Sequence, residues 1–239
     1  MTTIVSARVD LRVPKLIAPL WHTALLVAIF AGLAISGALF QHEASVDPRM
    51  LQQHTNMVPL YLSLLAMEWA LFLYVRKGVR LTGFSLRELV GGRWTSVRSV
   101  AVDFSLAAAI WALWSLIQLI WNHVSGPSHA ASIQILLPQG ATEKVLWIAV
   151  SASAGICEEL AFRGYFQRQF AALAHSRWIA LFVQAALFGI SHGYQGVEAC
   201  ARIAVFGLLF GLLAVWRSSL RPGMVAHAWG DIASGIFGI

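Results

Sequence analysis

Residues Val145–Ala174 have the sequence VLWIAVSASAGICEELAFRGYFQRQFAALA, a run with the length and composition of a membrane-spanning helix. Three charged side chains, Glu158, Glu159 and Arg163, lie close together in the middle of it. Such residues are costly at membrane depth, and they normally serve a function together with a nearby partner. Three of them within six positions therefore predict a functional site inside a helical membrane protein.

The composition of the whole chain indicates an integral membrane protein. Of its 239 residues, 58% are hydrophobic and 12% are charged, and the mean hydropathy is +0.69. The formal net charge is +6, but the basic residues are spread between the apolar runs and do not form one patch. We therefore expect contact with the lipid bilayer and no nucleic-acid partner. Cys157 and Cys200 have neither metal-finger nor paired secretory spacing, and we expect both to be buried packing residues.

The apolar runs predict an all-α fold, a polytopic transmembrane helix bundle with about seven membrane helices, or eight if residues 81–100 also insert. The predicted spans are Leu20–Phe40, Met57–Val75, Val102–Trp121, Val145–Ala174, Trp178–His192, Ala199–Trp216 and Met224–Ile239. The first span is expected to be an anchor and not a cleaved signal peptide, because its apolar run is longer than a usual signal core. We divide the chain into N-terminal membrane helices, residues 1–144, and a motif-bearing region, residues 145–239.

The basic residues predict the orientation of the bundle. Placing successive connections on alternate sides gathers most of them on one side, namely Arg8, Arg12, Lys15, Arg76, Lys77, Arg80, Arg87, Arg93, Arg98, Arg168, Arg177, Arg217 and Arg221. By the positive-inside rule the N-terminus is then cytoplasmic, and an odd number of spans leaves the C-terminus outside. We expect a multi-pass protein of a plasma membrane such as the bacterial inner membrane.

Three features of the N-terminal region have structural interpretations. Glu68 lies inside the second span without a patterned neighbour, so we expect it to face the bundle and bond to another helix. Phe84–Val90 resembles an amphipathic segment at the membrane surface. Asp103 is placed where a helix cap or an interfacial residue would sit.

The spacing inside the charged stretch separates its two glutamates. Residues four apart share a face of an α-helix, whereas neighbours diverge by about 100°. Glu159 can therefore pair with Arg163, and this leaves Glu158 on another face as a candidate base. A buried pair that only joins two helices is the structural alternative. The adjacent second carboxylate favours function, because a structural pair needs no further buried charge.

The turn near Ala174 predicts a partner for Glu158. Counting back from Ala174 to Glu158 gives 16 residues, and counting forward to His192 gives 18. An antiparallel helical hairpin would therefore bring Glu158 and His192 to nearly equal height. Phe188, one turn before His192, would line the same site.

His227 and Asp231 add two more ionisable groups, again four apart in an apolar run. They could line one polar chamber together with the charged stretch. His227, however, lies only a few residues from the Arg217–Arg221 connection, so its depth differs from that of Glu158. Either the fourth and fifth helices project into the cytoplasm or the chain breaks near His192 inside the membrane.

Three motifs in this order resemble those of the CAAX protease and bacteriocin-processing family (CPBP, or Abi) of intramembrane proteases, which includes the Ras-converting CAAX endopeptidases. The motifs are Glu158-Glu159-x-x-x-Arg163, Phe188-x-x-x-His192 and His227-x-x-x-Asp231. The resemblance covers about Val145–Ile239. It implies a helical bundle that hydrolyses a peptide bond of a membrane-associated protein or peptide, in or beside the bilayer.

The resemblance also implies roles for the motif residues. Glu158 and His192 would activate the attacking water. Glu159 and Arg163 would support that glutamate, and the two residues of the third motif would stabilise the oxyanion. Asp231 stands where many family members have Asn, and an ionised Asp only accepts hydrogen bonds. It must therefore be protonated, orient the neighbouring histidine or bind a cation.

The resemblance leaves the cofactor open. Members of the family have been described both as metalloproteases and as glutamate-dependent proteases without a protein-bound metal. Glu158, His192 and His227 are candidate ligands for a divalent metal such as zinc. The His-Glu-x-x-His motif of many zinc proteases is absent from the sequence.

Other functions are compatible with parts of the sequence. Residues 189–193 match Gly-x-Ser-x-Gly, so an intramembrane serine protease could use Ser191 with His227, although that motif requires a strand, a turn and a helix. A non-proteolytic transporter could use the polar chamber as an ion relay, but the chain lacks internal repeats. An immunity or scaffold protein could retain the fold without catalysis. Nothing in the sequence specifies whether a substrate would be prenylated.

Overall fold

The structure is a computed structural model, and it describes residues 15–46, 56–126 and 136–238. The described part is helical and contains no strand. Its elements are α1 (Leu20–Val46), α2 (Val58–Leu81), α3 (Leu86–Val90), α4 (Val97–Ser125), α6 (Ala141–Glu159), η2 (Leu160–Phe166), α7 (Gln167–Ala174), α8 (Arg177–Ile190), η3 (Gly193–Gln195), α9 (Val197–Arg217) and α10 (Arg221–Phe237). The predicted all-α fold is confirmed.

Five helices in the described part are long and apolar enough to cross a membrane, fewer than predicted. They cover Leu20–Leu39, Val58–Leu81, Val97–Ser125, Ala141–Ala174 and Val197–Arg217. The other two predicted spans are also helical, but α8 has 14 residues and α10 has 17. At about 1.5 Å per residue they fall short of a hydrocarbon core of roughly 30 Å. The predicted count of seven or eight membrane helices is therefore not confirmed.

Residues 81–100 do not form the optional eighth span. Their only separate helix is α3, with five residues, which ends at Gly91 in a left-handed conformation. Ser85 caps α3, and its amide and hydroxyl donate hydrogen bonds to Glu88 that lower the pKa of this exposed carboxyl. Leu89 is buried against the bundle. The predicted surface segment is therefore a short helix that packs on the bundle through Leu89 and the partly buried Phe84, Leu86 and Val90. Arg168 also donates hydrogen bonds to the Glu88 and Leu89 carbonyl oxygens.

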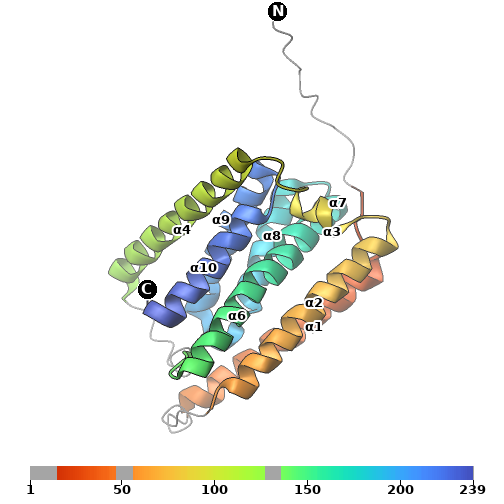
Figure 1. Cartoon of the computed structure of the whole chain (residues 1–239). Coiled ribbons are helices and arrows are strands. Elements are labelled where there is room, and N and C mark those ends of the chain that lie inside the picture. Colours follow the sequence, from red (N-terminus) through yellow and green to blue (C-terminus); the bar gives the residue numbers. More distant parts are fainter. Residues whose placement is uncertain (1–14, 47–55, 127–135, 239) are drawn as a thin grey trace, which may run out of the picture.

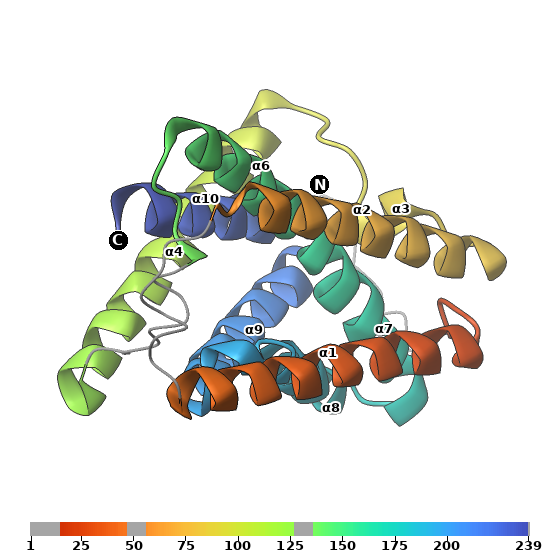
Figure 2. The same cartoon turned by 90° about the horizontal axis from the view of Figure 1, so that it is seen from below.

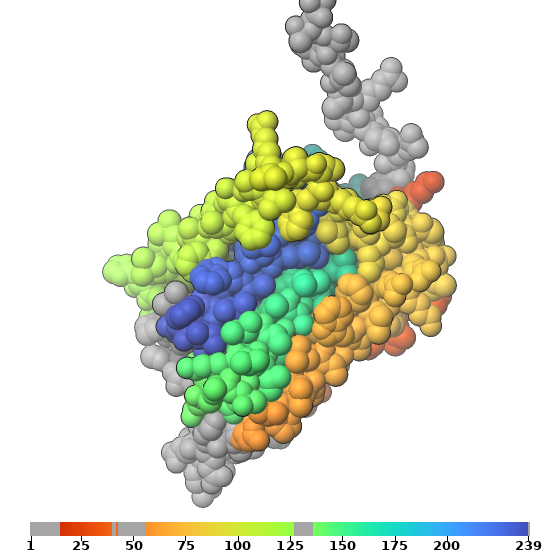
Figure 3. All heavy atoms as spheres, in the orientation of Figure 1, coloured from red at the N-terminus to blue at the C-terminus, as the bar shows by residue number. Residues whose placement is uncertain are grey.

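One long helix organises the bundle. The segments α6, η2 and α7 follow one another without a break, and η2 is a π-helical turn in the middle. The first part, α6, packs against α2 and α10, whereas α7 packs against α8. Figure 3 shows α10, α6 and α2 as neighbouring bands on one face. In Figures 1 and 2 the helices α1, α8 and α9 lie behind this face.

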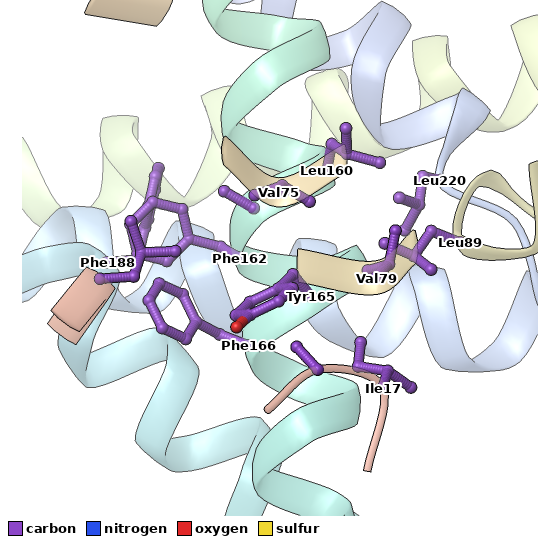
Figure 4. Close-up of a cluster of buried hydrophobic side chains, with 13 residues drawn as sticks. Ile17, Val75, Val79, Leu89, Leu160, Phe162, Tyr165, Phe166, Phe188 and Leu220 are labelled. Carbon is purple, nitrogen blue, oxygen red and sulfur yellow. The ribbon is translucent and has the colours of Figure 1, made fainter. Parts of the chain in front are cut away.

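The main apolar core surrounds η2 (Figure 4), whose seven residues are all buried. Phe162 and Phe166 of η2 face each other with ring centroids 5.6 Å apart. Phe162 also meets Phe188 of α8 at 4.8 Å in an edge-to-face arrangement. Lipid supplies little hydrophobic driving force between helices, so close packing of this kind stabilises the bundle.

A buried polar network joins α1 and α2 to the π-helix. The Tyr165 hydroxyl lies 2.8 Å from His22 Nδ1 and 2.9 Å from Thr23 Oγ1. On its other side the His22 ring lies 3.1 Å from the Tyr74 carbonyl oxygen, and the Tyr74 hydroxyl donates to the His22 carbonyl at 2.8 Å. Gly78 makes room for the imidazole, because a Cβ there would collide with it. Helices without any recognised motif therefore position the motif-bearing helix.

Asp103 is a buried ion-pair residue and not the cap of α4, which is Ser96. It accepts hydrogen bonds from Arg217 Nε at 2.8 Å, from Arg221 Nε at 3.0 Å and from Trp94 Nε1 at 2.7 Å. The interpretation of Asp103 as a helix cap was wrong, and its alternative placement at the membrane interface stays a prediction. Its carboxylate instead forms ion pairs that join α4 to the connection between α9 and α10.

Candidate active site

Glu159 and Arg163 form a buried ion pair, as their spacing predicts. Arg163 Nη1 lies 3.1 Å from Glu159 Oε1, and the two side chains are 0% and 1% exposed. The pair spans the point where α6 passes into the π-helical turn. A π-helical turn inserted in an α-helix often accompanies a functional site.

His227 of α10 is the second partner of Glu159. Its Nδ1 lies 3.0 Å from Glu159 Oε1, the oxygen that also meets Arg163. Because a carboxylate only accepts, this contact places a proton on Nδ1 and orients the imidazole. His227 Nε2 then faces Glu158 Oε2 at 3.8 Å and Asp231 Oδ2 at 3.6 Å. The carboxylate expected to support Glu158 thus also holds a histidine of another helix.

The close approach of α6 and α10 makes this contact possible. A Cβ at Gly155 would lie 2.7 Å from the Ala228 nitrogen and 2.8 Å from the Met224 carbonyl oxygen. Any residue other than glycine would therefore push the two helices apart. Gly155 lies one turn before Glu159, and Ala228 directly follows His227.

Aromatic rings enclose the Arg163 guanidinium. Its Cζ lies 4.2 Å from the centroid of Phe188, 5.7 Å from Phe206 and 5.9 Å from Phe210. Among the described residues its nitrogens have no hydrogen-bond partner apart from the ion pair with Glu159. Arg163 is therefore held by one carboxylate and by the faces of three rings, and its side chain is fully buried.

Phe188 lines the site, as its position one turn before His192 predicts. Its ring centroid lies 4.9 Å from that of His192 and 6.1 Å from that of His227. Phe188 also packs on Phe162, one turn after Glu158. This contact supports the predicted register of the antiparallel hairpin.

His192 lies in the turn after α8, where the chain leaves its helix inside the bundle. Its Nδ1 is 2.9 Å from the Phe188 carbonyl oxygen and 3.2 Å from Ser191 Oγ. The adjoining residues pack on α1, since a Cβ at Gly193 would lie 2.9 Å from the Ala34 carbonyl oxygen. The helix therefore ends beside His192. A break of the chain at this point is one of the two explanations given above for the different depths of Glu158 and His227.

Glu158 has a partner that the sequence did not identify. It lies within hydrogen-bonding reach of Glu68 of α2. Among the described side chains no hydrogen bond or ion pair joins Glu158 to His192, although both border the same region. Glu68 is buried in the bundle, as expected for a carboxyl that faces other helices, and the candidate base on α6 lies near it. The only signal in the sequence was a single carboxylate in an apolar span.

Ser191 does not have the surroundings of a nucleophile. Its hydroxyl donates to the Phe188 carbonyl oxygen at 2.7 Å and thereby satisfies the end of α8. Residues 177–190 before it are helical, so the strand of a nucleophile elbow is missing. His227, the proposed partner of Ser191, is held by Glu159 instead.

The candidate metal ligands do not form a metal site in this arrangement. Within the described ranges no three His, Cys, Asp or Glu side chains converge as ligands. Glu158 Oε2 and His227 Nε2 lie 3.8 Å apart, but no hydrogen bond or ion pair among the described residues joins His192 to either of them. The set Glu158, His192 and His227 therefore does not fit a zinc ion as it stands.

Comparison with known proteins places the site within one family segment. Residues 140–233 match the model of the family described as type II CAAX prenyl endopeptidase Rce1-like. This confirms the resemblance carried by the three motifs, and the matched segment contains all six predicted site residues. No curated protein and no solved structure matches the chain.

Proposed function

From the premise that residues 140–233 belong to an Rce1-like CAAX protease segment, we propose that this chain is an intramembrane endopeptidase. It hydrolyses a peptide bond of a membrane-associated substrate with water activated by Glu158 and His192. The observation that carries the proposal is the buried convergence of Glu158, Glu159 and His227 from two helices. Ionisable groups collected inside a membrane bundle are a mark of function.

Glu158 acts as the general base. Among the described residues its Oε2 is buried without a hydrogen-bond partner, so this oxygen is available to a water molecule. His192 donates from Nδ1 to the Phe188 carbonyl, which leaves the Nε2 lone pair free to orient the same water. Glu158 takes the proton as the water oxygen attacks the scissile carbonyl, and the proton then passes to the leaving amine.

His227 stabilises the oxyanion of the tetrahedral intermediate. Glu159 at Nδ1 and Asp231 beside Nε2 together favour the doubly protonated imidazolium. Its Nε2–H then donates a hydrogen bond to the developing negative charge. Asp231 in this scheme orients His227, which is the second of the three roles open to an Asp at this position. Arg163 holds Glu159 in place through their buried ion pair.

The substrate we propose is a peptide whose C-terminal CAAX motif is prenylated on its cysteine, the class that the family description names. The test uses the purified full chain in lipid vesicles with two synthetic peptides, one farnesylated and one unmodified. Mass spectrometry measures release of the residues after the cysteine. Cleavage of the farnesylated peptide alone supports the proposal. Cleavage of both supports a protease without prenyl selectivity.

Variants of the site separate the mechanisms. Glu158→Ala, His192→Ala and His227→Ala should each abolish cleavage while the protein still elutes as a folded species, whereas Ser191→Ala should remain active. Loss of activity in Ser191→Ala together with activity in Glu158→Ala would establish the serine alternative. Full activity of Glu158→Ala would by itself refute the general-base role.

The proposed orientation has the N-terminus in the cytoplasm, in a plasma membrane such as the bacterial inner membrane. In Figure 1, α1 begins at the end of the bundle near α3, and α10 ends at the opposite end. The basic residues at the C-terminal ends of α2 and α9 lie near α3. Arg8 and Arg12, which also entered the topology argument, lie outside the described residues. Reporter fusions at both termini test the orientation.

A further inference from the structure

The outward face of α2 carries an apolar stripe. Leu62, Trp69 and Leu73 lie on one side of the helix, two turns and one turn apart, and all three are exposed. Figure 3 shows α2 along the outer surface of the bundle. From Leu62 to Leu73 the helix rises by about 16 Å, close to half of a hydrocarbon core of roughly 30 Å. The stripe therefore has the length of the acyl region of one leaflet.

Three basic residues continue the same face toward the C-terminal end of α2. These α2 cations, Arg76, Lys77 and Arg80, follow Leu73 by three, four and seven positions, and all are exposed. Together with Leu73 and Leu81 their side chains line a shallow hollow of about 330 Å³. The hollow is thus cationic in its middle and apolar at both ends.

No acidic side chain of the described ranges neutralises the α2 cations. Their side chains have no hydrogen bond or ion pair within residues 15–46, 56–126 and 136–238. Glu68, the only acidic residue of α2, is buried and lies eight positions before Arg76. Glu88 of the neighbouring α3 accepts hydrogen bonds from Ser85. The positive charge of this face is therefore available to an anion from outside the described chain.

Exposed tryptophans place the α2 cations at the depth of the lipid headgroups. Trp21 lies in the first turn of α1, Trp94 follows α3, and Trp216 lies in the last turn of α9. In Figure 1 these ends of α1 and α9 lie at the same end of the bundle as α3 and the C-terminal end of α2. Tryptophan is enriched at the interface between membrane and water. The cations therefore lie at the headgroup level, directly beyond the apolar stripe.

We propose that this face of α2 binds an anionic phospholipid of the adjacent leaflet. Arg76 and Arg80, one turn apart, offer planar forks that match phosphate oxygens, and Lys77 adds a point charge beside them. The acyl chains lie along Leu73 and the rest of the apolar stripe. A zwitterionic lipid fits less well, because its own amine neutralises its phosphate. The site goes beyond the proposed function, since α2 lies outside residues 140–233 and the lipid takes no part in cleavage.

The orientation of the bundle explains the presence of basic residues at this end, but not their arrangement. The positive-inside rule counts Lys and Arg near a membrane helix, whichever face carries them. The helix dipole favours a cation in the last turn of α2, where only Arg80 lies. A lipid site requires several cations on one face beside an exposed apolar stripe. The control arginines, Arg87, Arg93 and Arg98, are also exposed at this end and do not line the hollow.

Native mass spectrometry of the purified full chain in detergent, titrated with phosphatidylglycerol or phosphatidylcholine, tests the site. The parent should retain phosphatidylglycerol in preference to phosphatidylcholine. The variant Arg76→Gln/Lys77→Gln/Arg80→Gln should bind phosphatidylglycerol roughly a hundredfold more weakly, because each cation near an anionic lipid contributes about fivefold. Replacing the three control arginines by Gln removes the same charge and should leave this affinity near that of the parent.

The thermal midpoint of unfolding in detergent distinguishes a lipid from a free anion. Phosphatidylglycerol should raise the midpoint of the parent and of the control variant, but not that of the α2 variant. Glycerophosphoglycerol, the same headgroup without acyl chains, should raise none of them. Stabilisation by this soluble headgroup alone would overturn the proposal in favour of a free phosphate site.

Two further results would overturn the proposal. One is equal retention of the two lipids by the parent. The other is an equal loss of affinity in the α2 and control variants, which would show a diffuse attraction by net charge. The substituted side chains are exposed, so the fold should persist, and the elution profile checks it. Should the triple variant not fold, Arg76→Gln and Arg80→Gln decide separately, and each should weaken binding about fivefold.

Discussion

Glu159 and His227, 68 positions apart in the chain, meet in the interior of the bundle with 3.0 Å between Oε1 and Nδ1. The same oxygen is 3.1 Å from Arg163 Nη1. One carboxylate oxygen therefore joins the motif-bearing helix to α10 and fixes which imidazole nitrogen faces Glu158. Glu159 therefore contributes both to the proposed function at Glu158 and to the stability of the bundle. The following variants distinguish the two contributions.

Glu159→Gln should reduce kcat strongly and change the stability of the fold only a little. The amide is similar in size, but it no longer favours the doubly protonated imidazole of His227. We expect a loss of about 10²-fold in kcat, in the range for one oxyanion donor. Single-turnover cleavage of the farnesylated peptide measures it. Parental activity in this variant would show that His227 needs no carboxylate at Nδ1.

Arg163→Met should destabilise the fold. Removing one partner of a buried ion pair leaves Glu159 with only its contact to His227, at a cost of about 3–5 kcal/mol. Unfolding in detergent, followed by tryptophan fluorescence, measures the change. Arg163→Met combined with Glu159→Gln should recover part of the loss, because the carboxylate that lost its arginine is then removed as well. A double variant no more stable than Arg163→Met would contradict this account.

Gly155→Val should inactivate the protein by separating α6 from α10. The added side chain meets backbone atoms of Met224 and Ala228, which cannot move without shifting the helix that carries His227. Cysteines introduced on the two helices and crosslinked would report the separation. Gly32→Val is the control, since a Cβ there has no atom within 4 Å. Equal activity of the two variants would show that the close approach is dispensable.

Asp103→Asn should lower stability without altering the site directly. Asp103 is fully buried, whereas Arg217 and Arg221 keep 28% and 12% of their side-chain area exposed, so solvent compensates part of the lost pairing. We expect a cost of roughly 1–3 kcal/mol. Thermal unfolding measures it, and peptide cleavage well below the midpoint should stay near the parental rate. A large loss of kcat at low temperature would instead connect this ion pair to the chemistry.

Chelators should leave peptide cleavage unchanged, because the described ligand candidates do not converge on a metal. The measurement is the initial rate of the purified chain after treatment with a strong chelator, together with metal analysis of the same sample. Activity lost on chelation and restored by zinc alone would show that Glu158, His192 and His227 rearrange into a metal site.

Local geometry explains the parts of the site that were predictable. Residues four apart share one face of a helix wherever that helix lies in the fold. This spacing predicts the pair of Glu159 with Arg163 and the alignment of His227 with Asp231. The membrane class likewise follows from apolar length and composition. The predicted spans at α8 and α10 are not confirmed, because an apolar run shows that a segment avoids water, whereas its helical length depends on where the chain breaks.

The sequence by itself determined the class of protein, the helical segments and the candidate residues for the chemistry, because these depend on composition and on spacing within one helix. Only the tertiary structure decided that Glu159 holds His227, that α2 packs against the helix of Glu158 and that His192 lies in a turn. Such contacts depend on the rotation and approach of separate helices, which small residues such as Gly155 permit and which no periodicity along one helix encodes.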